Sequence, residues 1–276
     1  MPENDLAAQI SVRNLTMAYG DFVVMRDLTF DIARGEVFVI MGGSGSGKST
    51  LMRHMIGLLK PAAGRVYYDE VDFTEADEEQ RNQMLRKFGV MFQGGALWSS
   101  MTLEENVAFP LVEFTELSKA DIRETVALKL ALVGLRGFEE FYPAQISGGM
   151  CKRASLARAM ALDPEILFFD EPSAGLDPVS ARRLDELILE LRDSLGTTVV
   201  VVTHELASIF AIADRAIFLD ATTRAMGGLG DPKSLRERTG NENLRLFLNR
   251  GMVGLQLSHD PATGAPFVAA PGRRKP

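Results

Sequence analysis

A glycine-rich turn between two apolar segments restricts the fold of this chain more than any other sequence feature. Residues 42–50 read Gly-Gly-Ser-Gly-Ser-Gly-Lys-Ser-Thr and fit the pattern G-x-x-x-x-G-K-[ST]. An apolar run over residues 37–41 precedes the turn, and an apolar-periodic stretch begins at Lys48. A phosphate-binding loop requires this strand–turn–helix context. A glycine-rich turn without a ligand is the alternative, and the flanking strand and helix disfavour it.

The chemistry of this turn suits phosphate groups. Glycines allow backbone N–H groups to converge on phosphate oxygens, and the N-terminus of the following helix adds a partial positive charge. Lys48 adds a full positive charge, and the hydroxyl of Ser49 is placed to bind Mg²⁺. The residues expected to contact the phosphates or the metal are Gly42, Gly43, Ser44, Gly45, Ser46, Gly47, Lys48, Ser49 and Thr50.

A second apolar run, over residues 166–169, ends in two carboxylates, Asp170 and Glu171. Open α/β sheets bind ligands at the carboxyl ends of their strands, so both carboxylates are expected at the phosphate site. Asp170 is then a ligand of Mg²⁺, directly or through water, and Glu171 orients the attacking water and accepts its proton. A solvated acidic turn is the alternative, and the phosphate loop disfavours it.

Short apolar runs alternate with amphipathic stretches, which indicates an α/β fold around a largely parallel sheet. The runs expected as buried strands are residues 37–41, 89–92, 166–169 and 199–202. The alternating runs expected as an antiparallel layer are residues 10–19, 22–32 and 65–73. The expected helices are residues 48–59, 75–88, 119–135, 148–162, 178–195 and 205–213. We predict a core domain over residues 10–240, a helical insertion over about 93–161 and a C-terminal extension over 241–276.

Composition excludes several classes of protein. The chain has 276 residues, a net charge of −7 and a single cysteine, Cys151. The acidic balance argues against a nucleic-acid-binding surface along the whole chain, and one cysteine cannot form an internal disulfide, which suits a reducing cytoplasm. The longest apolar runs fall far short of the about 20 residues that span a bilayer. We therefore expect no nucleic-acid partner. If the chain works at a membrane, we expect it to do so through a partner protein.

Three further segments follow the phosphate loop in a fixed order. The chain reads Phe-Tyr-Pro-Ala-Gln-Ile-Ser-Gly-Gly-Met at 141–150, Glu-Pro-Ser-Ala-Gly-Leu-Asp-Pro at 171–178 and Thr-His-Glu at 203–205. Over about residues 10–240 the chain thus resembles the ATP-binding-cassette (ABC) ATPases. The resemblance implies the P-loop NTPase fold of an ABC cassette, with a mixed, mostly parallel sheet, an antiparallel β layer and an inserted helical subdomain. It also implies ATP hydrolysis with ATP and Mg²⁺ as cofactors.

The resemblance assigns roles to individual positions. Tyr19 matches the aromatic residue that stacks on adenine, and Gln93 matches the glutamine that senses Mg²⁺ and water. His204 matches the histidine at the γ-phosphate, and Asp177 matches a residue that touches the opposite protomer. For Tyr19 an ordinary strand residue is the alternative, for Gln93 a polar loop residue, for His204 a structural histidine, and for Asp177 a helix cap before Pro178. The signature loop is matched by Ser147, Gly148 and Gly149.

The signature loop explains why such a chain pairs with a second copy of itself. Ser147 stands at the start of an expected helix, so its hydroxyl and the following N–H groups form a second positive pole. In the family this pole comes from the other subunit, and ATP lies between the two chains. Hydrolysis removes the γ-phosphate that bridges them, and the closed dimer loses its stabilisation.

Two departures from the commonest ABC pattern narrow the resemblance. Met150 stands where the signature usually has glutamine, and the segment after Gln93, within residues 92–111, departs from the common sequence. Both features resemble the ATPases of lipid-trafficking ABC systems associated with MCE (mammalian cell entry) proteins, including the Mla system. The resemblance implies phospholipid transport at the cytoplasmic face of the inner membrane. Its implied partners are a membrane permease, a small STAS-domain subunit and an MCE lipid carrier.

Other interpretations remain for the transported molecule and for two apolar segments. An importer ATPase for a polar solute such as an amino acid would fit Tyr142-Pro143 equally well, and a cassette without a permease is a further alternative. A groove for a permease helix is expected at Leu97, Trp98, Met101 and Leu103, unless these residues belong to the core. The extension is either a flexible tail or an arm that reaches the other protomer, with apolar anchors at Leu244, Leu246, Phe247, Leu248 and Phe267.

Overall fold

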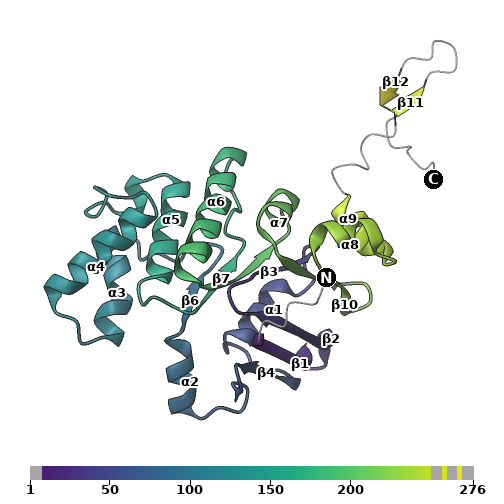
Figure 1. Cartoon of the computed structure of the whole chain (residues 1–276), viewed down its shortest axis with the longest axis horizontal. Coiled ribbons are helices and arrows are strands. Elements are labelled where there is room, and N and C mark those ends of the chain that lie inside the picture. Colours follow the sequence, from purple (N-terminus) through teal and green to yellow (C-terminus); the bar gives the residue numbers. More distant parts are fainter. Residues whose placement is uncertain (1–7, 250–256, 260–265, 269–276) are drawn as a thin grey trace.

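A six-stranded sheet forms the centre of the protein (Figure 1). The computed structural model describes residues 8–249, 257–259 and 266–268. The strand order is β10-β9-β3-β8-β7-β6, and only β10 runs antiparallel to its neighbour. The strands are β3 (Val37–Gly42), β6 (Phe88–Met91), β7 (Ile166–Asp170), β8 (Thr198–Thr203), β9 (Arg215–Asp220) and β10 (Ala225–Gly230).

A smaller antiparallel sheet lies on one side of the central sheet, as the alternating runs predicted. Its strands are ordered β2-β1-β4-β5, with β1 (Ala8–Tyr19), β2 (Phe22–Ala33), β4 (Ala63–Tyr68) and β5 (Val71–Asp72). Two further short strands, β11 (Leu257–His259) and β12 (Pro266–Val268), pair with each other. The mixed sheets confirm the predicted fold class.

Helices cover both faces of the central sheet. The helical group α3, α4 and α5 extends from one end of the molecule, and α1 lies between the two sheets (Figure 1). The helices are α1 (Lys48–Met55), α2 (Glu78–Leu85), α3 (Leu103–Phe114), α4 (Lys119–Leu132), the short 3-10 helix η1 (Pro143–Gln145), α5 (Gly148–Ala159), α6 (Pro178–Leu195), α7 (Leu206–Ile212), α8 (Pro232–Arg238) and α9 (Glu242–Leu248). None of the helices in the described ranges has the length and apolarity needed to cross a bilayer.

The central sheet separates two hydrophobic cores. Strand β3 shows this directly, because Phe38 and Ile40 pack toward α1 and the small sheet whereas Val39 and Met41 pack toward the other helices. Side chains alternate between the faces of a strand, so a strand that is apolar at every position is buried on both sides. The same reason explains the continuous apolar run of β8, all of whose residues are buried.

Local capping sets where the helices α3 and α4 begin. Thr102 forms a capping box with Glu105 at α3, and the hydroxyl of Ser118 accepts a hydrogen bond from the backbone of Asp121 at α4. Such caps satisfy backbone N–H groups that have no partner inside the helix. Helix α1 ends at Met55, earlier than predicted, and Gly57 follows with a φ of 73° in the left-handed region that favours glycine.

The first part of the predicted extension belongs to the core of this chain. Helix α9 buries Leu244, Phe247 and Leu248, and the ring of Phe247 lies 5.3 Å from that of Phe218 in β9. An arm formed by the whole extension would need these three residues as anchors on a second protomer. They are instead buried within their own chain and are not such anchors. Leu246 is half-exposed, and the side chain of Phe267 lies outside the described residues.

We expect Phe247→Ala to lower the free energy of unfolding by about 3 kcal/mol, because removing a buried phenylalanine ring leaves a cavity. Urea denaturation followed by circular dichroism measures the change. Leu246→Ala, on the same helix with an exposed side chain, is the matched control and is expected to shift stability by no more than about 0.5 kcal/mol. Equal stability of the two variants would contradict the docking of α9.

Candidate nucleotide site

Three neighbouring strands end at one edge of the central sheet and bring the predicted residues together. Strand β3 ends at Gly42 before the glycine-rich loop, β7 ends at Asp170 before Glu171, and β8 ends at Thr203 before His204. Strand β8 lies between β3 and β7 and is parallel to both. This edge is where open parallel sheets bind ligands.

The glycine-rich loop requires glycine at defined positions. A Cβ atom on Gly42 would lie 2.5 Å from Oγ of Ser46, and one on Gly47 would lie 2.7 Å from a methyl group of Val24. Gly47 also has a φ of 88° and caps α1. The ammonium group of Lys48 donates hydrogen bonds to the carbonyls of Gly42 and Gly43, at 3.1 and 3.0 Å. The loop thus holds a buried positive charge at the N-terminus of a helix, as an anion site requires.

Ser49 and Asp170 form a pair beside the loop. The Ser49 hydroxyl donates a 2.8 Å hydrogen bond to Oδ1 of Asp170. Burial raises the pKa of the Asp170 carboxyl, and the hydrogen bond from Ser49 opposes that rise. A hydroxyl and a buried carboxylate on adjacent elements are hard oxygen donors of the kind that Mg²⁺ prefers. These two residues therefore fit a magnesium ion bound beside phosphate groups.

Glu171 is held in an unusual conformation against His204. Its φ of 49° lies in the left-handed region, which is costly for a residue with a side chain and concentrates at functional sites. Oε1 of Glu171 lies 2.7 Å from Nδ1 of His204 and 4.0 Å from the Lys48 ammonium. Oε2 is buried and has no hydrogen-bond partner among the described residues. One carboxylate oxygen is thus oriented, and the other remains able to accept a proton.

Gln93 lies in an exposed loop after β6, and its backbone is bound by the helix of the signature loop. Lys152 in α5 donates a hydrogen bond to the carbonyl of Gln93. Arg158 in the same helix donates to the carbonyls of Gly95 and Ala96, at 2.9 and 2.6 Å. Burial lowers the pKa of Lys152, while the charges of Asp170 and Glu171 raise it. Lys152 and Arg158 could not be found from the sequence, because backbone acceptors on a distant loop leave no motif.

The remaining predicted residues belong to other segments of the chain than the phosphate loop and the strand ends beside it. Ser147 caps α5, is exposed and accepts a 3.2 Å hydrogen bond from the backbone of Met150. Figure 1 shows α5 apart from α1, so the chain does not close its signature loop, Ser147–Gly149, on its own phosphate loop. Asp177 caps α6 through two 3.0 Å hydrogen bonds from the backbone of Val179 and Ser180. Hydrogen bonding from the side chain of Ser180, and then from its backbone, lowers the pKa of the Asp177 carboxyl. Tyr19 ends β1 and is 49% exposed.

The fold and the site together define a P-loop ATPase, in which a lysine, paired carboxylates and a histidine meet at the end of a parallel sheet. The family model described as ABC transporter matches residues 25–174. The chain belongs to this family. The resemblance stated from the sequence motifs is thereby confirmed.

Relatives with high identity are transport ATP-binding proteins of bacteria. The "Intermembrane phospholipid transport system ATP-binding protein MlaF" of Haemophilus influenzae is 40% identical over 76% of this chain and 80% of that protein. The Escherichia coli K12 protein of the same name is 37% identical over 79% and 81%. The "Probable ribonucleotide transport ATP-binding protein mkl" of Mycobacterium leprae is 39% identical over 96% of this chain and 76% of that protein.

Solved structures of ABC cassettes share the fold. The ATP-binding cassette MJ0796, solved as a dimer in a post-hydrolysis state bound to ADP and Pi, has a TM-score of 0.73 at 31% identity and covers 80% of this chain and 98% of that one. The cbiO1 protein of Clostridium perfringens, part of the cbiONQ transporter complex, has a TM-score of 0.77 at 26% identity and covers 90% and 96%. These structures confirm the predicted architecture.

Proposed function

We propose that this chain is the ATP-hydrolysing subunit of an ABC transporter that moves phospholipid. The observation that carries the ATPase function is the contact of Glu171 with His204 at the carboxyl edge of the sheet, 4.0 Å from the ammonium of Lys48. This arrangement places a proton acceptor, a hydrogen-bonding histidine and a cation around one point. That point lies beside the loop that suits the phosphates.

In the proposed reaction each group has one task. Lys48 and the N–H groups at the start of α1 bind the β- and γ-phosphates and stabilise negative charge there. Oε2 of Glu171 accepts the proton of the attacking water, while Nδ1 of His204 donates to Oε1 and holds the carboxylate in place beside the γ-phosphate. Ser49 and Asp170 would hold Mg²⁺, with Gln93 approaching from its loop, and the ion would neutralise phosphate charge. Tyr19 supplies an aromatic face for adenine.

Two copies of the chain are proposed to complete two sites. Ser147, Gly148 and Gly149 form the N-terminus of α5, where backbone N–H groups without helical partners and a partial positive charge suit a phosphate. Because these groups lie away from the phosphate loop of their own chain, they serve the nucleotide bound to the other copy, and Asp177 lies at the same junction. The dimer of MJ0796 bound to ADP and Pi supports this arrangement.

Relatives support phospholipid as the transported class. The MlaF proteins are named for intermembrane phospholipid transport, whereas mkl is named for ribonucleotide transport. Met150 and the segment after Gln93, which carried the lipid prediction, are the features that separate this chain from commoner cassettes. We therefore favour lipid over a polar solute such as an amino acid. A STAS-domain subunit and an MCE lipid carrier at the cytoplasmic face of the inner membrane complete the proposed assembly.

The groove proposed to receive the permease differs from the one expected over residues 97–103. Leu103 is fully buried and Leu97 packs against the core, so these two residues do not line a groove. Trp98 is exposed and its ring lies 6.2 Å from that of Phe109. A cavity of about 460 Å³ lies instead between α2, β6, α3 and α5, lined by Leu85, Phe88, Val90, Pro110, Phe114, Leu162 and their neighbours.

This groove connects to the nucleotide site through α5. Arg158 lines the cavity and also holds the carbonyls of Gly95 and Ala96 after Gln93. A short permease helix bound against Leu85 and Phe114 would therefore lie in the cavity that Arg158 lines, and Arg158 holds the loop that carries Gln93. Apolar grooves of this kind bind amphipathic helices.

Affinity purification from native membranes tests the proposed assembly. We expect the wild-type chain to bring down a permease and an MCE protein, with phospholipid detected by mass spectrometry. Phe114→Glu is expected to reduce permease recovery at least ten-fold, because it places a charge in the apolar groove. Leu128→Glu, an exposed leucine on α4 outside the groove, is the matched control. Recovery of a solute-binding protein in place of the MCE protein would favour the importer alternative, and undiminished permease recovery with Phe114→Glu would reject this groove.

A further inference from the structure

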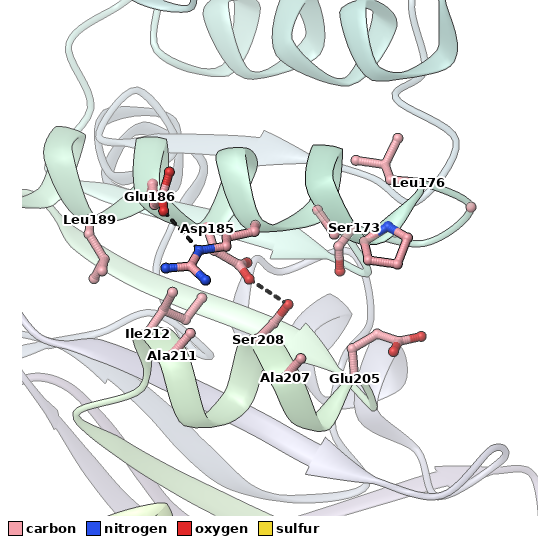
Figure 2. A pocket seen from close by; sticks show the side chains of 14 residues that line it. Ser173, Leu176, Asp185, Glu186, Leu189, Glu205, Ala207, Ser208, Ala211 and Ile212 are labelled. Atoms are coloured by element: carbon pink, nitrogen blue, oxygen red, sulfur yellow. Dashed lines mark hydrogen bonds and ion pairs between the residues drawn. The ribbon is translucent and has the colours of Figure 1, made fainter.

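A second cavity, of about 690 Å³, opens between α6 and α7. Figure 2 shows it between the side chains of the two helices, with Ser173 and Glu205 at one end and Leu189 and Ile212 at the other. This volume is in the range of pockets that bind small molecules. None of the residues predicted to bind nucleotide or metal lines it.

Two residues that line the cavity, Asp185 and Ser173, carry buried polar atoms without hydrogen-bond partners among the described residues. Asp185 of α6 is 6% exposed, and its Oδ2 accepts a 2.8 Å hydrogen bond from Ser208 of α7. Oδ1 of Asp185 has no hydrogen-bond partner among the described residues, and neither has Oγ of Ser173, which is 5% exposed. Burial raises the pKa of Asp185, and nearby Glu186 adds to that rise while the Ser208 bond opposes it. A buried carboxylate oxygen left without a donor is costly.

The charge and the walls of the cavity define what would satisfy these groups. Glu186 and Glu205 add two carboxylates at its edge, and Arg182 is the one cation among the lining residues. Arg182 lies 3.0 Å from Glu186 and is thereby paired. The remaining lining is largely apolar, from Leu176, Pro178, Ala181, Leu189, Ala207, Ala211 and Ile212.

We propose that this cavity is a binding site for a small organic cation, a guanidinium or ammonium group on a short apolar stem. The cationic head donates hydrogen bonds to Oδ1 of Asp185 and to Oγ of Ser173, and the stem lies against Leu189 and Ile212. Charge-assisted hydrogen bonds to a buried carboxylate are strong, and the apolar walls favour an alkyl stem over a hydrated metal ion.

The position of the cavity connects its occupant to the nucleotide site. Ser173 follows Glu171 by two residues, and Oε1 of Glu205 lies 3.5 Å from Nε2 of His204. A cation beside Glu205 competes with His204 for that carboxylate. The occupant therefore regulates ATP hydrolysis, a role that rests on the proposed function, whereas binding itself does not.

Isothermal titration calorimetry of the full chain with n-butylguanidinium tests the site. We expect one molecule to bind per chain, with n-butylurea, its uncharged counterpart of similar shape, at least ten-fold weaker. Asp185→Asn keeps the shape and an acceptor for Ser208 but removes the charge, and is expected to weaken binding at least ten-fold. Glu190→Gln, on the same helix and outside the cavity, makes the same change of charge and is expected to bind like the wild type.

Further outcomes separate the parts of the proposal. Ala211→Phe fills the cavity without changing the carboxylate and is expected to abolish binding. If circular dichroism shows that Asp185→Asn does not fold, Ala211→Phe tests the site in its place. Equal binding of n-butylguanidinium to wild type and to these variants, or equal binding of n-butylurea, would overturn the site. With binding established, an unchanged turnover of ATP at saturation would overturn only the regulatory role; we expect at least a two-fold change.

Discussion

Replacing Glu171 by glutamine is expected to lower ATP hydrolysis at least a hundred-fold and to leave ATP binding intact. The amide has the size of the carboxylate, and its oxygen can still accept a hydrogen bond from Nδ1 of His204, which now lies 2.7 Å from Oε1. It cannot accept a proton, and general bases contribute about 10²- to 10⁴-fold to such reactions. Steady-state phosphate release measures turnover, and equilibrium binding of ATP measures occupancy.

The same variant is expected to accumulate as a dimer with ATP, because the bridging γ-phosphate is not removed. Sedimentation velocity with and without ATP measures this. Glu165→Gln is the matched control, since Glu165 precedes the opposite end of β7 and pairs with Lys87 at 3.0 Å, away from the nucleotide. The control is expected to hydrolyse ATP at the wild-type rate. If Glu171→Gln did so as well, Glu171 would not be the proton acceptor.

The residues that meet at the candidate nucleotide site could be predicted from the sequence because they stand at the ends of strands. Three apolar runs end at Gly42, Asp170 and Thr203, and parallel neighbours in a sheet bring their carboxyl ends to one edge. The start of the extension reads as helical and forms α9, whereas the strands β9 and β10 and the helix α8 were not predicted. Their sequences are short and contain glycine or charge, so only pairing with β3 and the core reveals them.

Contacts between distant segments could not be predicted, because they depend on how faces meet. Trp98 and Leu103 are both large and apolar, yet one is 53% exposed and the other is in the core. Only the path of the loop before α3 separates them, and Asn106 fixes that path by donating to the carbonyls of Trp98 and Met101. The left-handed conformation of Glu171 and the hydrogen bond from Lys152 to Gln93 likewise depend on the folded surroundings and could not be predicted.

A second large effect is expected from Ser147→Arg, which places a bulky cation at the N-terminus of α5. We expect turnover to fall at least a hundred-fold, comparable to the loss of a charge-stabilising group, while ATP binding by a single chain stays unchanged. Ser118→Arg is the matched control, because Ser118 caps α4 through the same type of bond and is far from the nucleotide in the proposed dimer. Phosphate release at the wild-type rate with Ser147→Arg would reject the shared site.

Mixing two inactive variants tests whether one site contains residues of both chains. Lys48→Ala removes the cation of the phosphate loop and is expected to be as inactive as Ser147→Arg. In a dimer that contains one of each, one site carries both changes and the other carries neither, because a two-fold axis relates the chains. If the sites act independently and the chains mix at random, phosphate release is expected to recover to roughly a quarter of the wild-type rate. If each site were built from one chain alone, phosphate release would not recover, since each variant would keep its own defect.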